Sequence, residues 1–431
     1  MTERPHQLAM LGGPRAVPPE TAAPRWPVVT RGDEEAVARV LTGGRLTATA
    51  EGEEEVPGLE REWAAYTGTA HCAAVGSGTA ALQLALAALG VGPGDEVVVP
   101  AVSMNATALA VVQQGARPVF ADIDPETYTM DPDAVRAVAG PRTKALLPVH
   151  LHGLPADMDA LRTIAAELGA AVVEDAAQSH GAAHRGRRTG ALGTVGCFSL
   201  HPSKNLPTCG EGGLLTTDDP DIHERVLRLR QFGEDPRPRR TRSYVSHIAG
   251  WNHRIGPVEA AFARSQLARL DEYGRRRAPG VLAFLDRLAS LPGLLVPVVP
   301  KGSVHAWHIL RFRLDPQALG LADEDAAALR RALHRALRAE GVPVSRYQEE
   351  PLPAHPAFTP HVPAGARFPV ARAVLTDSLC LQRRHLDPGS GPVLAAYADG
   401  FEKVWQHLDL IRRMVRSASP AARGRQEVSA V

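Results

Sequence analysis

The stretch from Val195 to Leu215, VGCFSLHPSKNLPTCGEGGLL, contains the features that decide the fold. An apolar run ends at about Ser199, and a loop bounded by Pro202 and Pro207 follows it. A Gly-Glu-Gly-Gly turn then leads into a second apolar run. Near-continuous apolar runs of this kind are typical of strands that are covered on both faces. Lys204 therefore lies in a loop between two expected buried strands.

The same type of apolar run recurs through the middle of the chain. The expected strands are Glu96–Pro100, Arg117–Ile123, Lys144–His150, Ala171–Asp175, Val195–Leu200 and Gly213–Thr217. Segments with a helical pattern lie between them, at Gly78–Leu89, Asn105–Gln113, Pro132–Ala139 and Asp157–Leu168. This alternation predicts an α/β doubly wound domain, with a mostly parallel sheet sandwiched by helices.

The pattern changes after about residue 260. Ile255–Leu285 is mostly helical, with an expected kink or break at Pro279. A strand at Ala306–Leu314 and helices at Glu324–Glu340 and Val393–Leu410 predict a smaller α+β domain. We therefore expect an N-terminal segment and large domain over residues 1–265, a small domain over 266–414, and a disordered tail over 415–431.

Composition excludes several classes of protein. The 431 residues contain 48 Lys+Arg and 47 Asp+Glu, so no overall basic field favours nucleic acid or an anionic membrane. The four cysteines have no paired spacing, which argues against a disulfide scaffold or a zinc site and fits a reducing cytoplasm. The start of the chain has no signal-peptide pattern, and no stretch approaches the roughly 20 apolar residues of a membrane helix. We expect a cytoplasmic protein without a metal, nucleic-acid or membrane partner.

Two segments place further chemistry near the expected sheet. In Val75–Leu89, VGSGTAALQLALAAL, a small-residue turn opens a helix, so free amides and the helix dipole favour a phosphate there. An ordinary capped helix has the same pattern. In Ala171–Ala182, AVVEDAAQSHGA, Asp175 ends a buried strand at the edge where open α/β folds bind ligands. Its carboxylate could bind metal, act as a base, pair with a cationic heterocycle, or be an ordinary loop acid, whereas Glu174 faces the other way and is expected to be structural.

Lys204 has two interpretations of its own. Most lysines are solvated surface charges. Desolvation and nearby cations in this loop could instead lower the amine's pKa, as a Schiff-base lysine requires.

In combination and order, GSGTAAL, EDAAQSHGA, CFSLHPSKNL and GEGG resemble the DegT/DnrJ/EryC1/StrS family of sugar aminotransferases. These are fold-type I pyridoxal-phosphate enzymes. The likeness covers roughly residues 10–410 and includes GARPVFADID (Gly115–Asp124), PVHLHGLPADMD (Pro148–Asp159) and GWNHRIGPVEAAFARSQLARLD (Gly250–Asp271).

The resemblance implies a pyridoxal 5'-phosphate site with defined roles. Lys204 would form the Schiff base and shuttle the proton, and Asp175 would keep the pyridine nitrogen protonated so that the ring acts as an electron sink. The other implied cofactor contacts are Ala177 against a ring face, Gln178 at the ring 3-hydroxyl, Gly78, Thr79 and Ser199 at the phosphate, and Asn252 reaching the phosphate from the neighbouring subunit. The implied assembly is a homodimer with shared active sites.

Met104 departs from the family pattern, which usually has an aromatic residue stacking on the ring at this position. A thioether can cover a π face, and a tolerated gap-filler is the other interpretation. His308 aligns with a family histidine near the acceptor, and His180 follows Gln178 by two. Both are candidates for substrate contact, with an ordinary structural role as the alternative.

The resemblance implies amino transfer from L-glutamate or L-glutamine to a ketone on a sugar or cyclitol, in antibiotic or other secondary metabolism. The opening LAMLGGPRAV (Leu8–Val17), followed by RWP (Arg25–Pro27), resembles the branch that acts on inosose-type cyclitols, and nucleotide sugars stay open. One alternative is dehydratase, aldol-type or decarboxylating chemistry on the same fold. Family dehydratases tend to replace the lysine with histidine, so Lys204 argues against that type. The other alternative, a non-catalytic cofactor-binding regulator, is disfavoured by the intact set of Asp175, Gln178 and Lys204.

Overall fold

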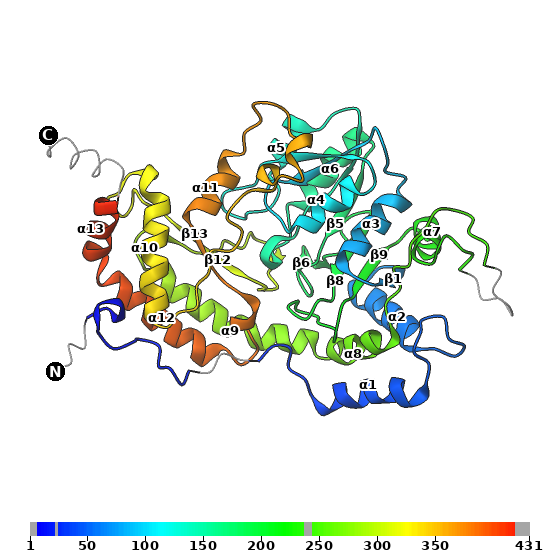
Figure 1. The fold of residues 1–431 in the computed structure, drawn as a ribbon, viewed down its shortest axis with the longest axis horizontal. Helices are drawn as coiled ribbons and strands as arrows, with labels where there is room; N and C mark the ends of the chain where they lie inside the picture. Colours follow the sequence, from blue (N-terminus) through cyan, green and yellow to red (C-terminus); the bar gives the residue numbers. More distant parts are fainter. Residues whose placement is uncertain (1–6, 22–24, 237–243, 419–431) are drawn as a thin grey trace.

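A seven-stranded sheet forms the centre of the larger part of the molecule (Figure 1). The computed structural model describes residues 7–21, 25–236 and 244–418. The strand order is β1-β9-β8-β5-β4-β2-β3, and β9 is antiparallel to both neighbours while the other pairs are parallel. The strands are β1 (His71–Val75), β2 (Glu96–Pro100), β3 (Arg117–Ala121), β4 (Thr143–Leu146), β5 (Ala171–Asp175), β8 (Val195–Ser199) and β9 (Gly213–Thr217). The expected α/β fold with a mostly parallel sheet is confirmed.

Helices cover both faces of this sheet because alternate residues of each strand point to opposite sides. Val97, Val99 and Val173 pack with α3 (Gly78–Ala88), α4 (Asn105–Val112) and α7 (Pro220–Arg230). On the other face, Val98 and Val172 pack with α5 (Pro132–Val138) and α6 (Met158–Leu168). Helices α2 (Glu55–Thr67) and α8 (Pro257–Leu267) cover the β1–β9–β8 end of that second face, and α1 (Arg31–Gly43) packs on α8.

A second core lies in the C-terminal part of the chain, on the left in Figure 1. A three-stranded antiparallel sheet, in the order β10-β12-β13, packs there with four long helices. Its elements are α9 (Leu270–Ala289), β10 (Leu294–Leu295), β12 (Leu310–Leu314), α10 (Ala326–Ala339), β13 (Ser378–Leu381), α12 (Gly391–Trp405) and α13 (Leu408–Ala418). The remaining described elements are α11 (Pro369–Asp377), the small sheet of β6 (Ala183–His184), β7 (Arg187–Arg188) and β11 (Ser303–Val304), and six short 3-10 helices that include Leu151–Gly153 and Arg383–His385.

The structure corrects three expectations for this C-terminal part. Helix α9 continues through Pro279, and the break lies at Ala268–Arg269, between α8 and α9. One face of α9 is buried in the C-terminal core, and this packing offsets the hydrogen bond that the proline lacks. The helix expected at Val393–Leu410 is divided into α12 and α13, and the expected strand at Ala306–Leu314 begins only at Leu310.

The expected tail is also partly wrong. Helix α13 reaches Ala418, and Val415 is buried in the C-terminal core, so residues 415–418 belong to the fold. The rest of the expected tail lies outside the described residues. Leu8 and Val17 also pack into the C-terminal core, a contact that the expected division at residue 265 did not include. Among the described helices, none is long and apolar enough to cross a membrane.

Candidate active site

Asp175 lies at the carboxyl end of β5, where its carboxylate is fixed by neutral donors. Thr107 of α4 donates from Oγ1 to Oδ2 at 2.7 Å, and the backbone amide of Ala177 donates to Oδ1 at 3.2 Å. Burial raises the pKa of Asp175, and the Thr107 hydrogen bond, the Ala177 amide and the charge of Lys204 oppose that shift. The result is a buried acid, held in one orientation, that favours a cationic partner.

Lys204 lies in the loop after β8 and is tied down by its backbone. Its amide donates to the carbonyl of His201 at 2.8 Å, and its own carbonyl accepts from Nε1 of Trp26 at 3.0 Å. Burial lowers the pKa of the Lys204 amine, while the charges of Asp175 and Glu211 oppose this shift. The two residues that the sequence paired most strongly, Lys204 and Asp175, therefore interact electrostatically in the fold.

Two buried histidines share this electrostatic environment. Burial lowers the pKa of His180 to about 3, and the charge of Lys204 contributes. Burial also lowers the pKa of His308 well below its usual range, with contributions from Lys204 and Arg383. Both rings are therefore neutral near pH 7. The Nδ1 atom of His308 has no hydrogen-bond partner within the described part of the chain, so this ring can bind a further polar group. The His180 ring lies next to the backbone of Ser199, which opposes the fall in its pKa.

Gln178 and His308 are joined through His152. The side-chain oxygen of Gln178 accepts from the backbone amide of His152 at 2.7 Å. The carbonyl of His152 in turn accepts from the amide of His308 at 3.0 Å. Arg311 of β12 donates from Nε to Nε2 of His152 at 3.0 Å, so a residue of the C-terminal sheet helps to fix this part of the site.

The expected phosphate cradle is a close contact between a helix and two strands. Gly78 is the first residue of α3, and Ser77 caps that helix by accepting from the Ala80 amide at 3.1 Å. A Cβ on Gly78 would lie 2.7 Å from Cβ of Ser199, at the end of β8. Thr79 follows in the first turn of α3. The small residue at position 78 lets the positive end of the helix approach the strand end, which suits an anion.

Asn252 and Met104 lie at the margins of this region. Asn252 is exposed, and its Oδ1 accepts from Nε of Arg254 at 3.0 Å. The carbonyl of the adjacent His253 accepts from the amide of Gly76 at 2.7 Å, which places this segment beside the start of the cradle. Met104 immediately precedes α4, and 54% of it is exposed. The roles implied for both residues stay predictions.

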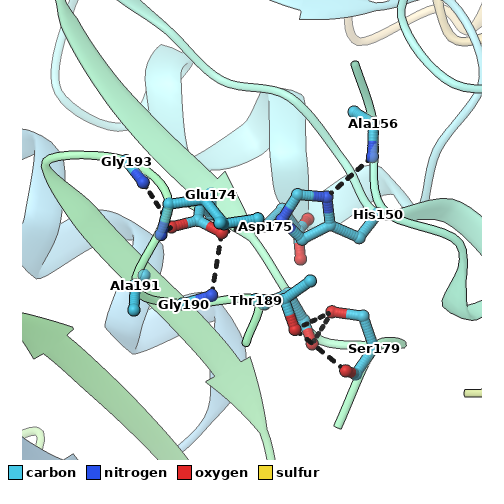
Figure 2. Close-up of polar contacts among 12 residues, drawn as sticks. His150, Ala156, Glu174, Asp175, Ser179, Thr189, Gly190, Ala191 and Gly193 are labelled. Carbon is cyan, nitrogen blue, oxygen red and sulfur yellow. Dashed lines mark hydrogen bonds and ion pairs between the residues drawn. The ribbon is translucent and has the colours of Figure 1, made fainter. Parts of the chain in front are cut away.

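The His-x-His segment at 150–152 gains a partner that the sequence did not reveal (Figure 2). Nε2 of His150 lies 2.8 Å from Oε2 of Glu174, and the His150 Nδ1 accepts from the Ala156 amide at 3.1 Å. The proton of this ring is therefore on Nε2, which donates to the carboxylate. Glu174 also accepts from the amides of Gly190, Leu192 and Gly193. These contacts occupy both groups structurally, and the described residues contain no cluster of three or more side chains that could hold a metal ion.

Sequence reasoning missed Thr107, Ser103 and Trp26. Ser103 and Thr107 are four residues apart at the start of α4, and their hydroxyl oxygens lie 2.7 Å from each other. This spacing was a usable signal, because residues i and i+4 share one face of a helix. Trp26 carried no comparable signal, because its contact with Lys204 spans 178 positions.

Comparison with known proteins places this site in a family. The model of the DegT/DnrJ/EryC1/StrS aminotransferase family matches residues 29–386. The chain belongs to this family. It is 39% identical over 373 residues to the dTDP-3-amino-3,4,6-trideoxy-alpha-D-glucose transaminase of Streptomyces venezuelae, which covers 86% of this chain and 92% of that protein.

Solved structures agree with the family assignment. The chain matches 3-amino-5-hydroxybenzoic acid synthase with a TM-score of 0.80 and 35% identity, covering 90% of this chain and 99% of that one. It matches NtdA of Bacillus subtilis, solved with the bound cofactor PMP, with a TM-score of 0.73 and 25% identity, covering 89% and 82% of the two chains. The expected fold-type I architecture and the assignment to an aminotransferase family are thereby confirmed.

Proposed function

We propose that this chain binds pyridoxal 5'-phosphate and transfers an amino group from L-glutamate or L-glutamine to a ketone on a sugar or cyclitol. The setting would be antibiotic or other secondary-metabolite biosynthesis. The observation that carries the proposal is the pairing of Lys204, whose amine pKa is lowered by burial, with the fixed carboxylate of Asp175. The Streptomyces venezuelae relative, named as a transaminase of a dTDP-sugar, supports the class of acceptor.

The residues present fit this cofactor. The close approach of Gly78 to Ser199, which leaves no room for a Cβ, brings the positive end of α3 next to the end of β8, where a phosphate would be favoured. The buried Asp175 receives hydrogen bonds from two neutral donors, so a cationic ring nitrogen would supply the charge that its environment lacks. When bound, pyridoxal phosphate supplies an electron sink for negative charge at a substrate carbon.

Individual side chains of the protein would then have separate roles in the reaction. Oδ1 and Oδ2 of Asp175 would hold a proton at the ring nitrogen. The lowered pKa of Lys204 increases the neutral amine fraction, and Nζ in this form can attach the cofactor and accept a proton. Gln178 would orient the ring, held in place by its hydrogen bond from His152. The neutral rings of His180 and His308 would contact substrate without adding charge.

We further propose a homodimer in which Asn252 completes the partner's cofactor site. Its exposure and its place beside Gly76 are compatible with a position at an interface. Light scattering would give the mass, and mixed dimers of Lys204→Ala and Asn252→Ala subunits would test sharing. Activity regained on mixing supports shared sites, and its absence contradicts them. The four free cysteines support the accompanying proposal of a reducing, cytoplasmic setting.

The cofactor proposal is tested by spectroscopy and mass spectrometry. Purified protein incubated with pyridoxal phosphate should gain a visible absorbance band, and borohydride reduction should fix the cofactor's mass on Lys204. Lys204→Ala should lose the band on dialysis, whereas the control Lys144→Ala, at an exposed lysine, should keep it. Adding L-glutamate or L-glutamine alone should convert the band to that of the pyridoxamine form. Wild-type protein that takes up no cofactor would refute the proposal.

A further inference from the structure

Two arginines from the C-terminal part of the chain lie buried beside the Lys204 loop. Arg277 belongs to α9, and Arg383 opens the short helix Arg383–His385 that follows β13. Each is only 3% exposed. Guanidinium groups are rarely buried this completely unless they are paired, so the partners of these two need an explanation.

Short contacts connect both arginines to the Lys204 loop. The guanidinium carbon of Arg383 lies 3.7 Å from the ring centroid of Trp26, whose indole donates to the carbonyl of Lys204. Arg277 donates from Nη1 to the carbonyl of Ala306 at 3.0 Å, and the side chain of Asn205 donates to the same oxygen at 2.7 Å. Each arginine is therefore linked to the lysine loop through one intervening residue, Trp26 for Arg383 and Ala306 for Arg277.

The two arginines also share a hydrogen-bond acceptor, the backbone carbonyl of Leu386. Arg277 donates from Nε to the carbonyl of Leu386 at 2.7 Å, and Arg383 donates from Nη1 to the same oxygen at 3.1 Å. Both guanidinium groups are thus held at one point of the loop that follows β13.

Their hydrogen-bonding capacity is only partly used. Nε and Nη2 of Arg383 and Nη2 of Arg277 have no partner among residues 7–21, 25–236 and 244–418. Asp387 is the acid whose charge acts on both arginines. Burial lowers the pKa of Arg277 to about 10 and that of Arg383 well below its usual range, with Asp387 opposing both shifts. Two cations and one carboxylate leave an excess positive charge with unused N–H groups.

Arg311, another buried arginine, has the hydrogen-bond partners expected of an arginine with a structural role. It is 1% exposed, and it donates to His152, Ser378, Gln348 and the carbonyl of Tyr347. Arg383 differs because two of its N–H groups have no partner in the described chain, while its guanidinium stacks on Trp26, the residue that donates to the Lys204 carbonyl. The charges of Arg383 and Lys204 both lower the pKa of His308.

We propose that Arg383, with Arg277 behind it, binds the α-carboxylate of the amino donor. The proposal rests on the proposed aminotransferase function. A planar guanidinium with free N–H groups matches a carboxylate in geometry and charge. The pyrophosphate of a nucleotide-linked acceptor shares this anionic chemistry. A carboxylate is the better fit because the two arginines are almost completely enclosed.

The test measures the two sources of anion separately on the loaded enzyme. Conversion to the pyridoxamine form is followed against L-glutamate concentration, and against L-glutamine, which gives an apparent Kd and a limiting rate. Arg383→Gln should raise the apparent Kd for the amino donor by about 10- to 100-fold, because the variant loses a charge-assisted hydrogen bond to the donor carboxylate. Arg383→Lys should recover part of the affinity. The affinity for dTDP, used as a probe of pyrophosphate binding, should stay unchanged.

Arg330→Gln is the matched control. Arg330 is also buried, with an unpartnered Nε in the described chain, but its electrostatic partners are Glu349, Arg346, Arg331 and Asp377. It should lose thermal stability without a change in donor affinity. If Arg383→Gln folds poorly, Arg383→Lys and Arg277→Gln provide the same comparison in proteins that keep more of the local packing.

The outcomes separate this inference from the function on which it rests. If wild type responds to L-glutamate or L-glutamine and the Arg383→Gln variant binds that donor with equal affinity, the inference is overturned and the proposed function stands. Weakened dTDP binding with unchanged donor affinity overturns it in favour of an acceptor pyrophosphate. Wild type that responds to neither donor refutes the proposed function, and the inference with it.

Discussion

The hydroxyl of Thr107 donates a 2.7 Å hydrogen bond to the carboxylate of Asp175 across 68 positions of sequence. Because Thr107 uses its single proton in this bond, Ser103 must be the donor in the 2.7 Å contact between their hydroxyls. The carbonyl of Ser103 accepts from the side chain of Gln348 at 2.8 Å. Gln348 of the C-terminal part thus fixes the backbone of Ser103, whose hydroxyl in turn donates to the residue that orients Asp175.

Replacing Thr107 with valine removes this bond while keeping the shape of the side chain. A buried carboxylate that loses one hydrogen bond is destabilised by about 1.5–3 kcal/mol, so we expect pyridoxal phosphate to bind about 10- to 100-fold more weakly. Absorbance titration of the apoprotein measures this affinity. Thr107→Ser keeps the hydroxyl and should bind nearly as tightly as wild type. Equal affinities for the valine variant and wild type would show that the bond does not orient Asp175.

The apoprotein should become more stable as the pH rises toward the ordinary lysine value. Burial lowers the pKa of Lys204 from 10.5, so between the lowered value and 10.5 the unfolded chain binds the proton more strongly than the folded chain. Lys204→Met should therefore melt above wild type at pH 7, and this difference should shrink toward pH 10. Thermal melts at several pH values measure it, with Lys144→Met as an exposed control. A difference that widens with pH would contradict the assigned shift.

Gly78→Ala should damage the phosphate cradle more than the fold. The added Cβ would lie 2.7 Å from Cβ of Ser199, so the start of α3 must move away from β8. Overpacking of this kind costs about 1–3 kcal/mol, and the cofactor should bind more weakly. Gly43→Ala, where a Cβ meets nothing within 4 Å, should be neutral or slightly stabilising. Unchanged cofactor affinity in Gly78→Ala would remove this helix end from the cofactor site.

Glu174→Gln should lower stability without any involvement of metal. Glutamine keeps one oxygen acceptor, and its amide nitrogen cannot accept at the other position, so either the Gly190 amide or the amides of Leu192 and Gly193 lose their acceptor. An unsatisfied buried donor costs about 1–3 kcal/mol. Urea unfolding measures the loss. Glu167→Gln, in an exposed pair with Arg136, should lower the unfolding midpoint much less. Dialysis against EDTA should leave the wild-type unfolding midpoint unchanged, and a clear shift would show that a bound metal ion stabilises the protein.

The local elements were predictable where chain-local signals were strong. β2 and β5 match their expected bounds, because a buried parallel strand needs a continuous apolar run. β1 was missed, because HCAAV contains only one β-branched residue and its pairing with β9 is a tertiary contact. Pro279 was expected to break a helix, yet the packing of α9 in the C-terminal core keeps that helix continuous. The local amino-acid pattern thus determined some helices and strands, and packing against residues distant in the sequence decided the others.

The sequence by itself determined the family motifs and most strands of the sheet, and it placed Asp175 at a strand end and Lys204 in the loop after a strand, because these are local features. The tertiary structure alone decided which groups orient those residues. Thr107, Trp26 and Arg383 approach the site from positions far apart in the chain, and no periodicity or spacing relates them. The electrostatic character of the Lys204 loop was likewise invisible in the sequence. It depends on burying Arg277 and Arg383 beside a single acid, and burial is set by the whole fold.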